Sequence, residues 1–506
     1  MSLPKRAQAA FLLGVALLAF TGTNRWFAPI DDETEFVTLA HQPLHQTVED
    51  YWHGHGQPEH PPLGGVLLHA WLPFGGAAFW SVRLPSVVLF LAGLLCLALA
   101  ARRIAGDSAF LPVLWIGVLW PFAFHFARLA DWYSLGFFLV AALTLTYLRY
   151  LDRPNWRRLI GFMTAAVLLV YSTYYGWVIV GCLAIDISLV RRKREAVTFL
   201  VMTSGVLVLA YVPLWRVFAE QVFQGSSISG WGDHSFASRF LMLAYHVYAL
   251  FVSESVAPWY WYASIPVAIG IFVSIILTVL LLPPERRRFL IYFVLLLTGM
   301  AVIDIITTKR LLFISGWLLL SFGIALANTE KLVSRRMLAI VLASLAAVGW
   351  GGVIARRYYA APHFIEPWFA VADDAANVVS AGGVVVTNSP SLLFSVNYSL
   401  RALGLVKSSA VPGWVEHPSV FSVEDVAPRN LVRRSPIMYV RGVNIGLDDR
   451  ADTTERWLVA HCLARSTRQL VPDSGYALKA RYFPSAGQRP YRISLQDYDC
   501  RQAVDD

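Results

Sequence analysis

Charged residues are scarce in this chain of 506 residues. Asp, Glu, Lys and Arg make up 15% of it, against about 25% of an ordinary soluble domain. Hydrophobic residues make up 57%. A disordered chain lacks the apolar residues that form a core, so this composition excludes disorder. It also argues against a simple soluble enzyme.

Cysteine is also rare: the chain has four, which is too few for a disulfide scaffold. Cys96 and Cys182 lie in apolar runs and are expected to fill space in a core. Cys462 and Cys500 lie in the polar C-terminal part, and we expect them to pair if that part faces an oxidising compartment. The sequence lacks a Walker or Rossmann glycine motif, so it gives no sign of a nucleotide site.

The net charge is +9, from 42 Lys and Arg against 33 Asp and Glu. Such an excess can indicate binding to nucleic acid. Here the basic residues form short clusters between long apolar runs, which is the pattern of membrane topology. We therefore predict a membrane protein and expect no nucleic-acid partner.

The apolar runs predict a polytopic α-helical membrane protein, because a bilayer span needs about 20 mostly apolar residues. The first run, at residues 7–27, has no clean signal-peptide cleavage site before Asp31, so we interpret it as a retained anchor. About eleven spans are expected in all. The others lie at roughly 84–101, 109–127, 132–149, 158–173, 174–190, 197–215, 263–282, 289–306, 311–328 and 337–354.

The basic clusters orient these spans, because basic residues favour the cytoplasmic side. If the spans alternate, the clusters at 5–6, 102–103, 149–158, 191–194, 286–288 and 331–336 all share one side. The external side then receives a first loop at about 28–82, the turn at Lys309 and Arg310, and everything after Arg356.

Two apolar stretches do not fit the alternation. A single crossing by residues 236–256 would place the 286–288 cluster outside, so we interpret this stretch as interfacial or re-entrant. Residues 63–80 contain glycine pairs, Pro73 and His and Trp residues, which suit a membrane interface. A helix on the outer leaflet is expected there.

The C-terminal part has ordinary polarity and is long enough for a core of its own. Residues 369–380 predict a short helix, and residues 382–387 predict a turn into a buried strand. We predict a transmembrane domain at residues 1–355 and an external α/β domain at residues 356–506.

The first external loop has the densest polar cluster. Asp31, Asp32 and Glu33 follow the first span, and five histidines come later, at positions 41, 45, 53, 55 and 60. A solvated loop is one interpretation. The other is a carboxylate site at the membrane surface, where an acid near apolar residues can act as a general base. The histidine spacing matches no compact zinc pattern, but a divalent cation at Asp32 and Glu33 stays open.

These residues resemble a known family. Residues 30–36 (Ile-Asp-Asp-Glu-Thr-Glu-Phe) look like the Asp-Glu motif of the GT-C glycosyltransferases. Residues 59–63, 81–86 and 127–131 resemble three further motifs of the protein O-mannosyltransferase and aminoarabinose transferase branch, in the same order. The lysine that part of the family has before Pro61 is replaced by His60, as in the mannosyltransferase form. The motifs cover about residues 1–150.

The resemblance implies a reaction and a location. Such enzymes pass a sugar from a polyprenyl-phosphate carrier to an acceptor outside the membrane, here a glycolipid, a polysaccharide or a protein. It implies that Asp32 is the general base, beside Glu33 and an additional Asp31. It also implies a multi-pass protein among the lipids of a bacterial inner membrane, with its active site and C-terminal domain on the periplasmic side. Residues of the further motifs that would bind substrate are His60, Arg83, Arg128 and Asp131.

An anionic donor phosphate needs a cationic partner. Lys309 and Arg310 lie on the external side, against the positive-inside trend, and we expect them to bind it. Chance placement is the alternative for this pair, and Arg83 and Arg128 could instead be interface anchors. We expect the cations and Asp32 to flank one pocket, within roughly 10 Å of each other.

Other interpretations remain at this point. Aromatic residues at 171–177 and 258–262 fit either an interface belt or a platform for a sugar. A lipid or glycan transporter (flippase) would need ionisable residues near mid-membrane, whereas Asp186 and Asp304 lie near predicted span ends. A transporter would often have repeated halves as well, and the sequence has no internal repeat. A non-catalytic protein whose tail binds partners is the other alternative.

Overall fold

The computed structural model describes most of the chain. The described residues are 4–24, 29, 31–53, 61–76, 78–224, 236–256, 258, 260–302, 308–355, 368–402, 404, 418–423, 430–431, 435–442, 449–470 and 493–500.

The chain divides into two compact units, and each is built from three stretches of sequence. The membrane unit contains Met1–Gly22, Pro43–Ala70 and Arg83–Ala355. The tail unit contains Thr23–Gln42, Trp71–Val82 and Arg356–Asp506. The predicted domains at residues 1–355 and 356–506 stay a prediction. The two short stretches from the predicted first loop group with the C-terminal part instead, because they pack against its helices.

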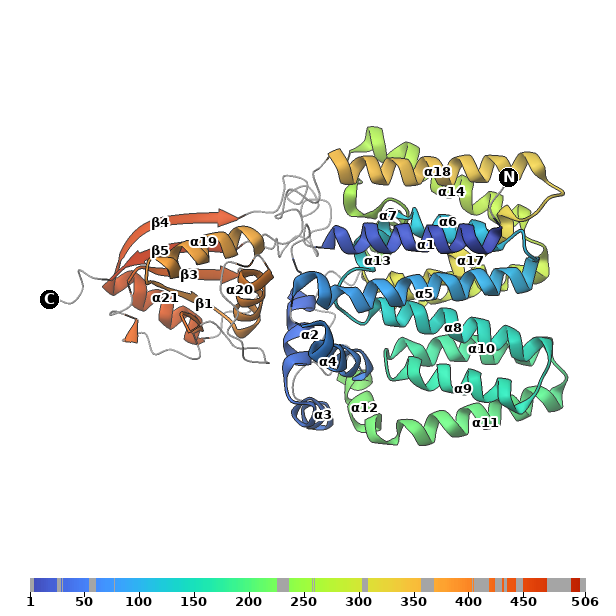
Figure 1. Ribbon diagram of the computed structural model, residues 1–506, viewed down its shortest axis with the longest axis horizontal. Helices are drawn as coiled ribbons and strands as arrows, with labels where there is room; N and C mark the ends of the chain where they lie inside the picture. Colours follow the sequence, from blue (N-terminus) through green and yellow to red (C-terminus); the bar gives the residue numbers. More distant parts are fainter. Residues whose placement is uncertain are drawn as a thin grey trace. The chain divides into compact units, whose positions relative to one another are not determined.

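The membrane unit is a bundle of helices that run mostly side by side (Figure 1). Five helices of the described chain are long and apolar enough to cross a membrane: Phe79–Ala105, Tyr133–Asp152, Lys193–Glu220, Trp261–Leu281 and Leu332–Ile354. The total of about eleven spans stays a prediction. The end of α4 and the start of α5, within residues 71–82, group with the tail unit. The helices that lie wholly or mainly in the membrane unit are α1 (Lys5–Gly22), α3 (Leu44–His53), α4 (Leu63–Gly75), α5 (Phe79–Ala105), α6 (Phe110–Val118), α7 (Pro121–Phe126), α8 (Tyr133–Asp152), α9 (Trp156–Val170), α10 (Tyr175–Val190), α11 (Lys193–Tyr211), α12 (Trp215–Gln224), α13 (Phe236–Val252), α14 (Trp261–Leu281), α15 (Arg288–Val302), α16 (Leu311–Ile314), α17 (Gly316–Leu326) and α18 (Leu332–Ala355).

Several predicted spans are shorter or broken in the structure. The run at 109–127 forms two helices, α6 and α7, that meet at Leu119 and Trp120. Trp120 is extended, with φ −80° and ψ 112°, because Pro121 disfavours a helical conformation in the residue before it. The ambiguous stretches at 63–80 and 236–256 form α4 and α13. Their predicted positions in the membrane stay predictions.

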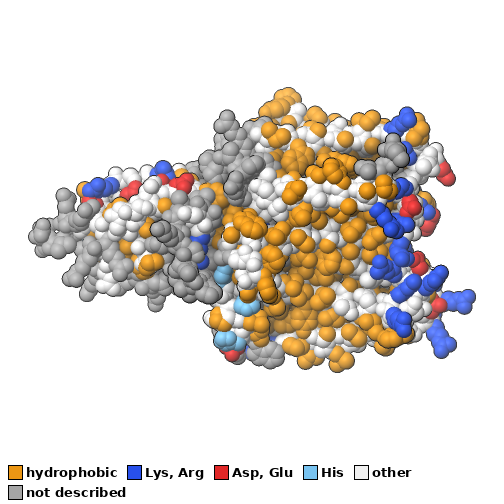
Figure 2. Space-filling view, in the orientation of Figure 1, with side chains coloured by type: hydrophobic (Ala, Val, Ile, Leu, Met, Phe, Trp, Pro, Cys, Tyr) orange, Lys and Arg blue, Asp and Glu red, His pale blue; other side chains and the backbone are white. Residues whose placement is uncertain are grey.

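The surface of the membrane unit separates hydrophobic from basic side chains. Lys and Arg gather at one end of the bundle, beyond a broad hydrophobic band (Figure 2). Residues from different basic clusters also meet neighbouring elements: Lys5 Nζ lies 3.2 Å from the carbonyl oxygen of Asp107, and Arg103 pairs with Asp152. A helix that faces lipid exposes its apolar residues. Helix α14 has a stripe of exposed apolar residues, spaced about one helical turn apart. Its members are Ile265, Ile269, Phe272, Ile276 and Leu280.

The C-terminal part of the tail unit is an α/β domain with a five-stranded sheet in the order β2-β1-β3-β5-β4. Strand β1 is parallel to β2 and β3, and β5 is antiparallel to β3 and β4. Side chains alternate across β1, so Val385 faces the core under α19 and α20, and Val386 faces the core under α21. The elements are α19 (Trp368–Ser380), β1 (Val384–Thr387), α20 (Pro390–Ala402), β2 (Val420–Ser422), β3 (Ile437–Gly442), α21 (Asp449–His461), β4 (Leu463–Leu470) and β5 (Ile493–Asp499).

The local predictions for this domain are confirmed. The predicted helix at 369–380 is α19, and the turn at Gly382 has φ 79°, a conformation that glycine adopts without strain. The next strand, β1, is buried along its length. An added Cβ on Gly383 would lie 2.2 Å from the carbonyl oxygen of Pro436, so this position requires glycine.

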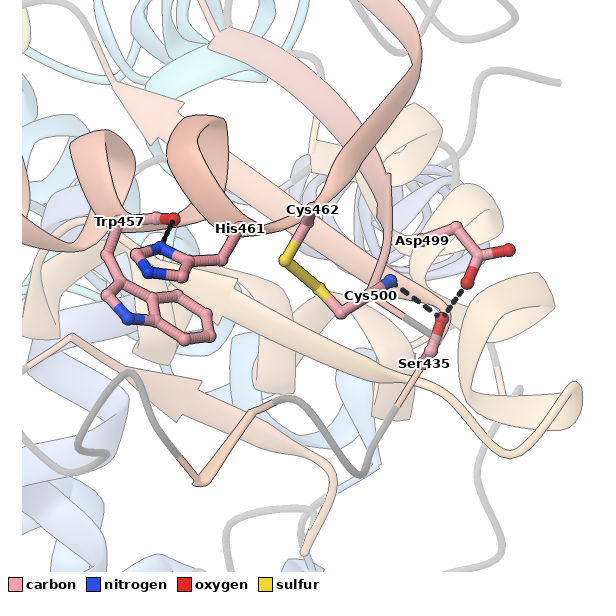
Figure 3. Close-up of a disulfide and its surroundings, with 6 residues drawn as sticks. All are labelled: Ser435, Trp457, His461, Cys462, Asp499 and Cys500. Atoms are coloured by element: carbon pink, nitrogen blue, oxygen red, sulfur yellow. Dashed lines mark hydrogen bonds between the residues drawn. A yellow bond between two sulfur atoms is a disulfide. The ribbon is translucent and has the colours of Figure 1, made fainter. Parts of the chain in front are cut away.

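The predicted disulfide is also confirmed. Cys462, which follows α21, is bonded to Cys500, which follows β5 (Figure 3). Beside it, the Ser435 hydroxyl donates to Asp499 Oδ1 at 2.7 Å and accepts from the Cys500 N–H at 3.3 Å. The two other cysteines, Cys96 and Cys182, are free thiols in α5 and α10. The bridge therefore belongs to the tail unit alone.

Candidate active site

The acidic motif begins a helix, α2 (Asp31–His41), in the tail unit. Asp31, Asp32 and Glu33 occupy its first turn, where backbone N–H groups lack helical partners and the helix dipole favours negative side chains. Glu33 is fully buried. The side chains of Asp31 and Asp32 lie outside the described part of the structure, so the role of Asp32 stays a prediction.

One broad face of α2 is buried in the tail unit. Thr34 Oγ1 lies 2.8 Å from Ser395 Oγ of α20, at hydrogen-bonding distance. One turn later, the Thr38 hydroxyl donates to the carbonyl oxygen of Thr34 at 2.7 Å. The apolar residues buried on this helix are Phe36, Val37 and Ala40. The motif helix therefore packs on the C-terminal α/β domain.

The segment Trp71–Val82, which contains the end of α4 and the start of α5, belongs to the same tail unit. Phe79, at the start of α5, lies 5.7 Å from Tyr398 of α20 and 6.1 Å from Phe369 of α19, measured between ring centroids. The Trp71 indole donates to the carbonyl oxygen of Ser81 at 3.0 Å. Burial lowers the pKa of Arg401 in the last turn of α20, because desolvation disfavours the charged form.

In the membrane unit, a second group of predicted residues gathers around Tyr133. The Asp131 side chain hydrogen-bonds to the Tyr133 hydroxyl, and Arg310 is near enough to interact with it electrostatically. Lys309 Nζ lies 5.9 Å from the centre of the Tyr133 ring. Arg310 Nη1 donates to the Tyr175 hydroxyl at 3.2 Å. Asp131, Lys309 and Arg310 thus form one cluster with two tyrosines, which we call the Tyr133 cluster.

Two more predicted cations are buried in this unit. Arg83 is 0% exposed and Arg128 is 1% exposed. The Arg128 guanidinium lies 4.1 Å from the centre of the Phe124 ring. No observation tests whether they bind substrate, so the choice between a substrate ligand and an interface anchor stays open for both. Buried charges in a membrane protein are costly and mark functional sites.

Other predictions about the site have different outcomes. His60 lies outside the described residues. The pocket shared by Asp32 and the cations stays a prediction, because the Asp32 side chain is not described. Among the described residues, no group of three or more His, Cys, Asp or Glu could hold a metal. A divalent cation at Asp32 and Glu33 therefore also stays a prediction.

The aromatic stretch at 171–177 packs largely on other aromatic rings. Trp177 lies 5.2 Å from Tyr211 and 5.3 Å from Trp215 between ring centroids. Trp261 and Tyr262, at the start of α14, are instead largely exposed. The choice between an interface belt and a sugar platform stays open for both stretches.

An apolar pocket opens between α6, α13, α17 and α18. A hydrocarbon chain fits such a lining, whereas a sugar needs polar partners. All of its lining residues are hydrophobic, and they include Trp115, Trp120, Phe251, Phe322 and Leu342.

The partners of several polar groups could not be predicted from the sequence. Asp186 lies near the end of α10, as expected, but its buried carboxylate accepts hydrogen bonds from the hydroxyls of Tyr147 and Tyr292 and pairs with Arg288. The roles of Tyr133 and Tyr175 were also missed. The only sequence signal was a polar residue within an apolar run, which does not say what it contacts.

Comparison with known proteins supports the fold. No family model and no curated protein sequence matches the chain. Two solved structures of ArnT from Cupriavidus metallidurans are similar to it at 14% identity, over 97% of this chain and 98% of theirs. The structure bound to undecaprenyl phosphate has a TM-score of 0.56, and the apo structure has 0.54. The chain therefore has the fold of these ArnT structures, which agrees with the resemblance of its motifs to the aminoarabinose transferase branch.

Proposed function

We propose that this protein is a membrane glycosyltransferase that moves a sugar from a polyprenyl-phosphate donor to an acceptor on the external face. The observation that carries the proposal is the similarity to ArnT over nearly the whole of both chains, including a structure bound to undecaprenyl phosphate. The order of the four sequence motifs supports it independently.

The reaction assigns a part to each group. Asp32 accepts a proton from the acceptor hydroxyl or amine, and the acceptor atom then bonds to the anomeric carbon of the donor sugar. The bond from that carbon to the phosphate oxygen breaks, and polyprenyl phosphate leaves with the electron pair. Lys309 and Arg310 bind the phosphate and stabilise the charge that develops on it. Arg83, Arg128, Asp131 and His60 complete substrate binding in this proposal.

The disulfide supports the proposed orientation. Bridges persist in oxidising compartments such as the bacterial periplasm and are rare in the cytosol. The Cys462–Cys500 bridge lies in the tail unit, whereas the free thiols of Cys96 and Cys182 lie in helices of the membrane unit. We therefore place the α/β domain and the active site on the periplasmic side of a bacterial inner membrane.

The central test is Asp32→Asn in the full-length protein. We expect turnover of a labelled polyprenyl-phosphate sugar to be lost, with normal expression and retained donor binding, because the amide cannot accept the acceptor proton. Asp107→Asn, an exposed position paired with Arg102, is the control for removing one carboxylate and should keep wild-type turnover. Unchanged function in Asp32→Asn would favour a transporter or a non-catalytic protein.

The acceptor class can be found in the cell. Mass spectrometry of cell-envelope glycans from strains with and without the gene should show one sugar missing from a glycolipid, a polysaccharide or a protein. The class that loses the sugar identifies the acceptor.

A further inference from the structure

The helix that carries the acidic motif is too short to be stable by itself. Helix α2 has 11 residues, and isolated helices shorter than about 12–15 residues are marginal in water. Its conformation must therefore depend on what it packs against. Among the described residues, α20 is the helix with which α2 makes its main contacts.

Helix α20 has two buried faces. One face, with Leu392, Val396 and Leu400, lies in the core above the sheet. A second face contains Ser395, Tyr398 and Ser399, which are also buried and are spaced three and four residues apart. The sheet thus fixes α20 from one side, and its second face is available to hold another element.

The N-terminal segments occupy this second face. Ser395 Oγ lies 2.8 Å from Thr34 Oγ1, although the two residues are 361 positions apart in the sequence. The Tyr398 ring packs against Phe79, which begins α5. Thr34 is two residues from Asp32 in the same helix, so a rigid contact at Thr34 also fixes the backbone that carries Asp32.

We propose that α20 is the packing surface that fixes the catalytic helix α2, and that Ser395 is a positioning residue, which acts on Asp32 through Thr34. This inference rests on the proposed function. A displacement of about 1 Å at a reacting group can cost up to about a hundredfold in rate. Loss of one buried hydrogen bond between the two helices should therefore lower the rate of transfer without changing how the donor binds.

The test compares two single variants with their double variant. Thr34→Val and Ser395→Ala each remove one hydroxyl of the pair, and we expect each to lower kcat about tenfold with an unchanged KM for the donor. The double variant should be no worse than either single variant, because both remove the same interaction. Thr34→Ser keeps the hydroxyl and should keep near-wild-type kcat.

The matched control is Ser399→Ala, on the same buried face of α20. Its hydroxyl has no hydrogen-bond partner among the described residues, so its removal should leave kcat within about twofold of wild type. Equal kcat values in Ser395→Ala and Ser399→Ala would overturn the proposal. If Asp32→Asn keeps full turnover, the proposed function itself has failed, and the two failures are therefore distinguishable.

A cysteine pair tests the contact between α2 and α20 without an activity assay. In Thr34→Cys with Ser395→Cys, sulfur atoms replace two oxygens that are 2.8 Å apart. A disulfide bond is about 2.05 Å long, so a small movement of the two side chains brings the sulfur atoms to bonding distance. We expect a disulfide to form in the oxidised full-length protein, detected as a linked peptide by mass spectrometry. Failure to form this bridge in a folded protein contradicts the contact.

Discussion

At the scale of single residues, the Tyr133 cluster gives the proposed donor site a specific composition. Two cations are held by aromatic residues: Lys309 lies near the Tyr133 ring, and Arg310 donates to the Tyr175 hydroxyl. Asp131 hydrogen-bonds to the same Tyr133. The two tyrosines therefore neighbour both cations that the proposal assigns to the donor phosphate.

Charge reversal at Arg310 tests this part of the site. We expect Arg310→Glu to raise KM for the donor about 10- to 100-fold, because a hydrogen bond to a charged group contributes about 1.5–3 kcal/mol. The KM for the acceptor should change much less. Steady-state kinetics with each substrate varied in turn provide the measurement.

The control is Arg153→Glu, which makes the same charge change at an exposed position after α8 and should leave both KM values unchanged. Equal increases in the two KM values for Arg310→Glu would show that Arg310 does not act on the donor.

Individual residues differ in how far the sequence could predict them. Residue type and position along the chain were enough to predict the Cys462–Cys500 pair and to select the acidic motif, Lys309 and Arg310 as candidates. The Thr34–Ser395 contact could not be predicted, because each residue is an ordinary hydroxyl-bearing residue in a helix and 361 positions separate them. Its formation depends on the tertiary packing of two segments, which leaves no local pattern.

At the scale of helices, Asp186 joins three of them. Its carboxylate on α10 accepts from Tyr147 of α8 and Tyr292 of α15, and it pairs with Arg288 at 3.0 Å. Within the membrane unit, these bonds hold the three helices together near the end of α10 and the start of α15. A buried carboxylate with three partners is costly to disturb.

We expect Asp186→Asn to lower the stability of the protein by about 2–3 kcal/mol, because it leaves Arg288 without its counter-charge. The effect should appear as a lower Tm in detergent, with an unchanged donor KM. Asp152→Asn is the matched control. Its pair with Arg103 is exposed, and such pairs contribute about 0–1 kcal/mol. Equal Tm changes in the two variants would contradict the structural role of Asp186.

The positions of most helices could be predicted, because apolar runs of span length are visible in the sequence. Whether each helix is continuous could not be predicted. The run at 109–127 was expected as one span, but Pro121 starts a new helix and leaves Trp120 extended. Helix α2 is a further case: its mixed polar sequence looks like a loop, and it is helical because α20 and its neighbours bury one of its faces.

At the scale of the whole molecule, orientation in the membrane is the property with the widest consequences. Basic side chains gather at one end of the membrane unit, and the tail unit contains a disulfide. Both observations favour an N-terminus in the cytoplasm and a tail outside.

Reporter fusions after Asp506 test this orientation. We expect alkaline phosphatase, which requires an oxidising compartment, to be active there, and a cytoplasm-dependent fluorescent protein to be inactive. The same reporters fused after Arg103, at the basic end of the bundle, should show the opposite pattern. Activity of the Asp506 fusion only in the cytoplasm would contradict both the topology and an external active site.

The grouping of residues 23–42 and 71–82 with the C-terminal domain has a consequence for engineering. A chimaera that exchanges only the region after Ala355 for that of a relative would pair a foreign α20 with the resident α2 and Phe79. Its two halves could each be well folded and still be inactive together. A productive exchange has to transplant three separate pieces of the gene at once, so this region cannot recombine as a single cassette.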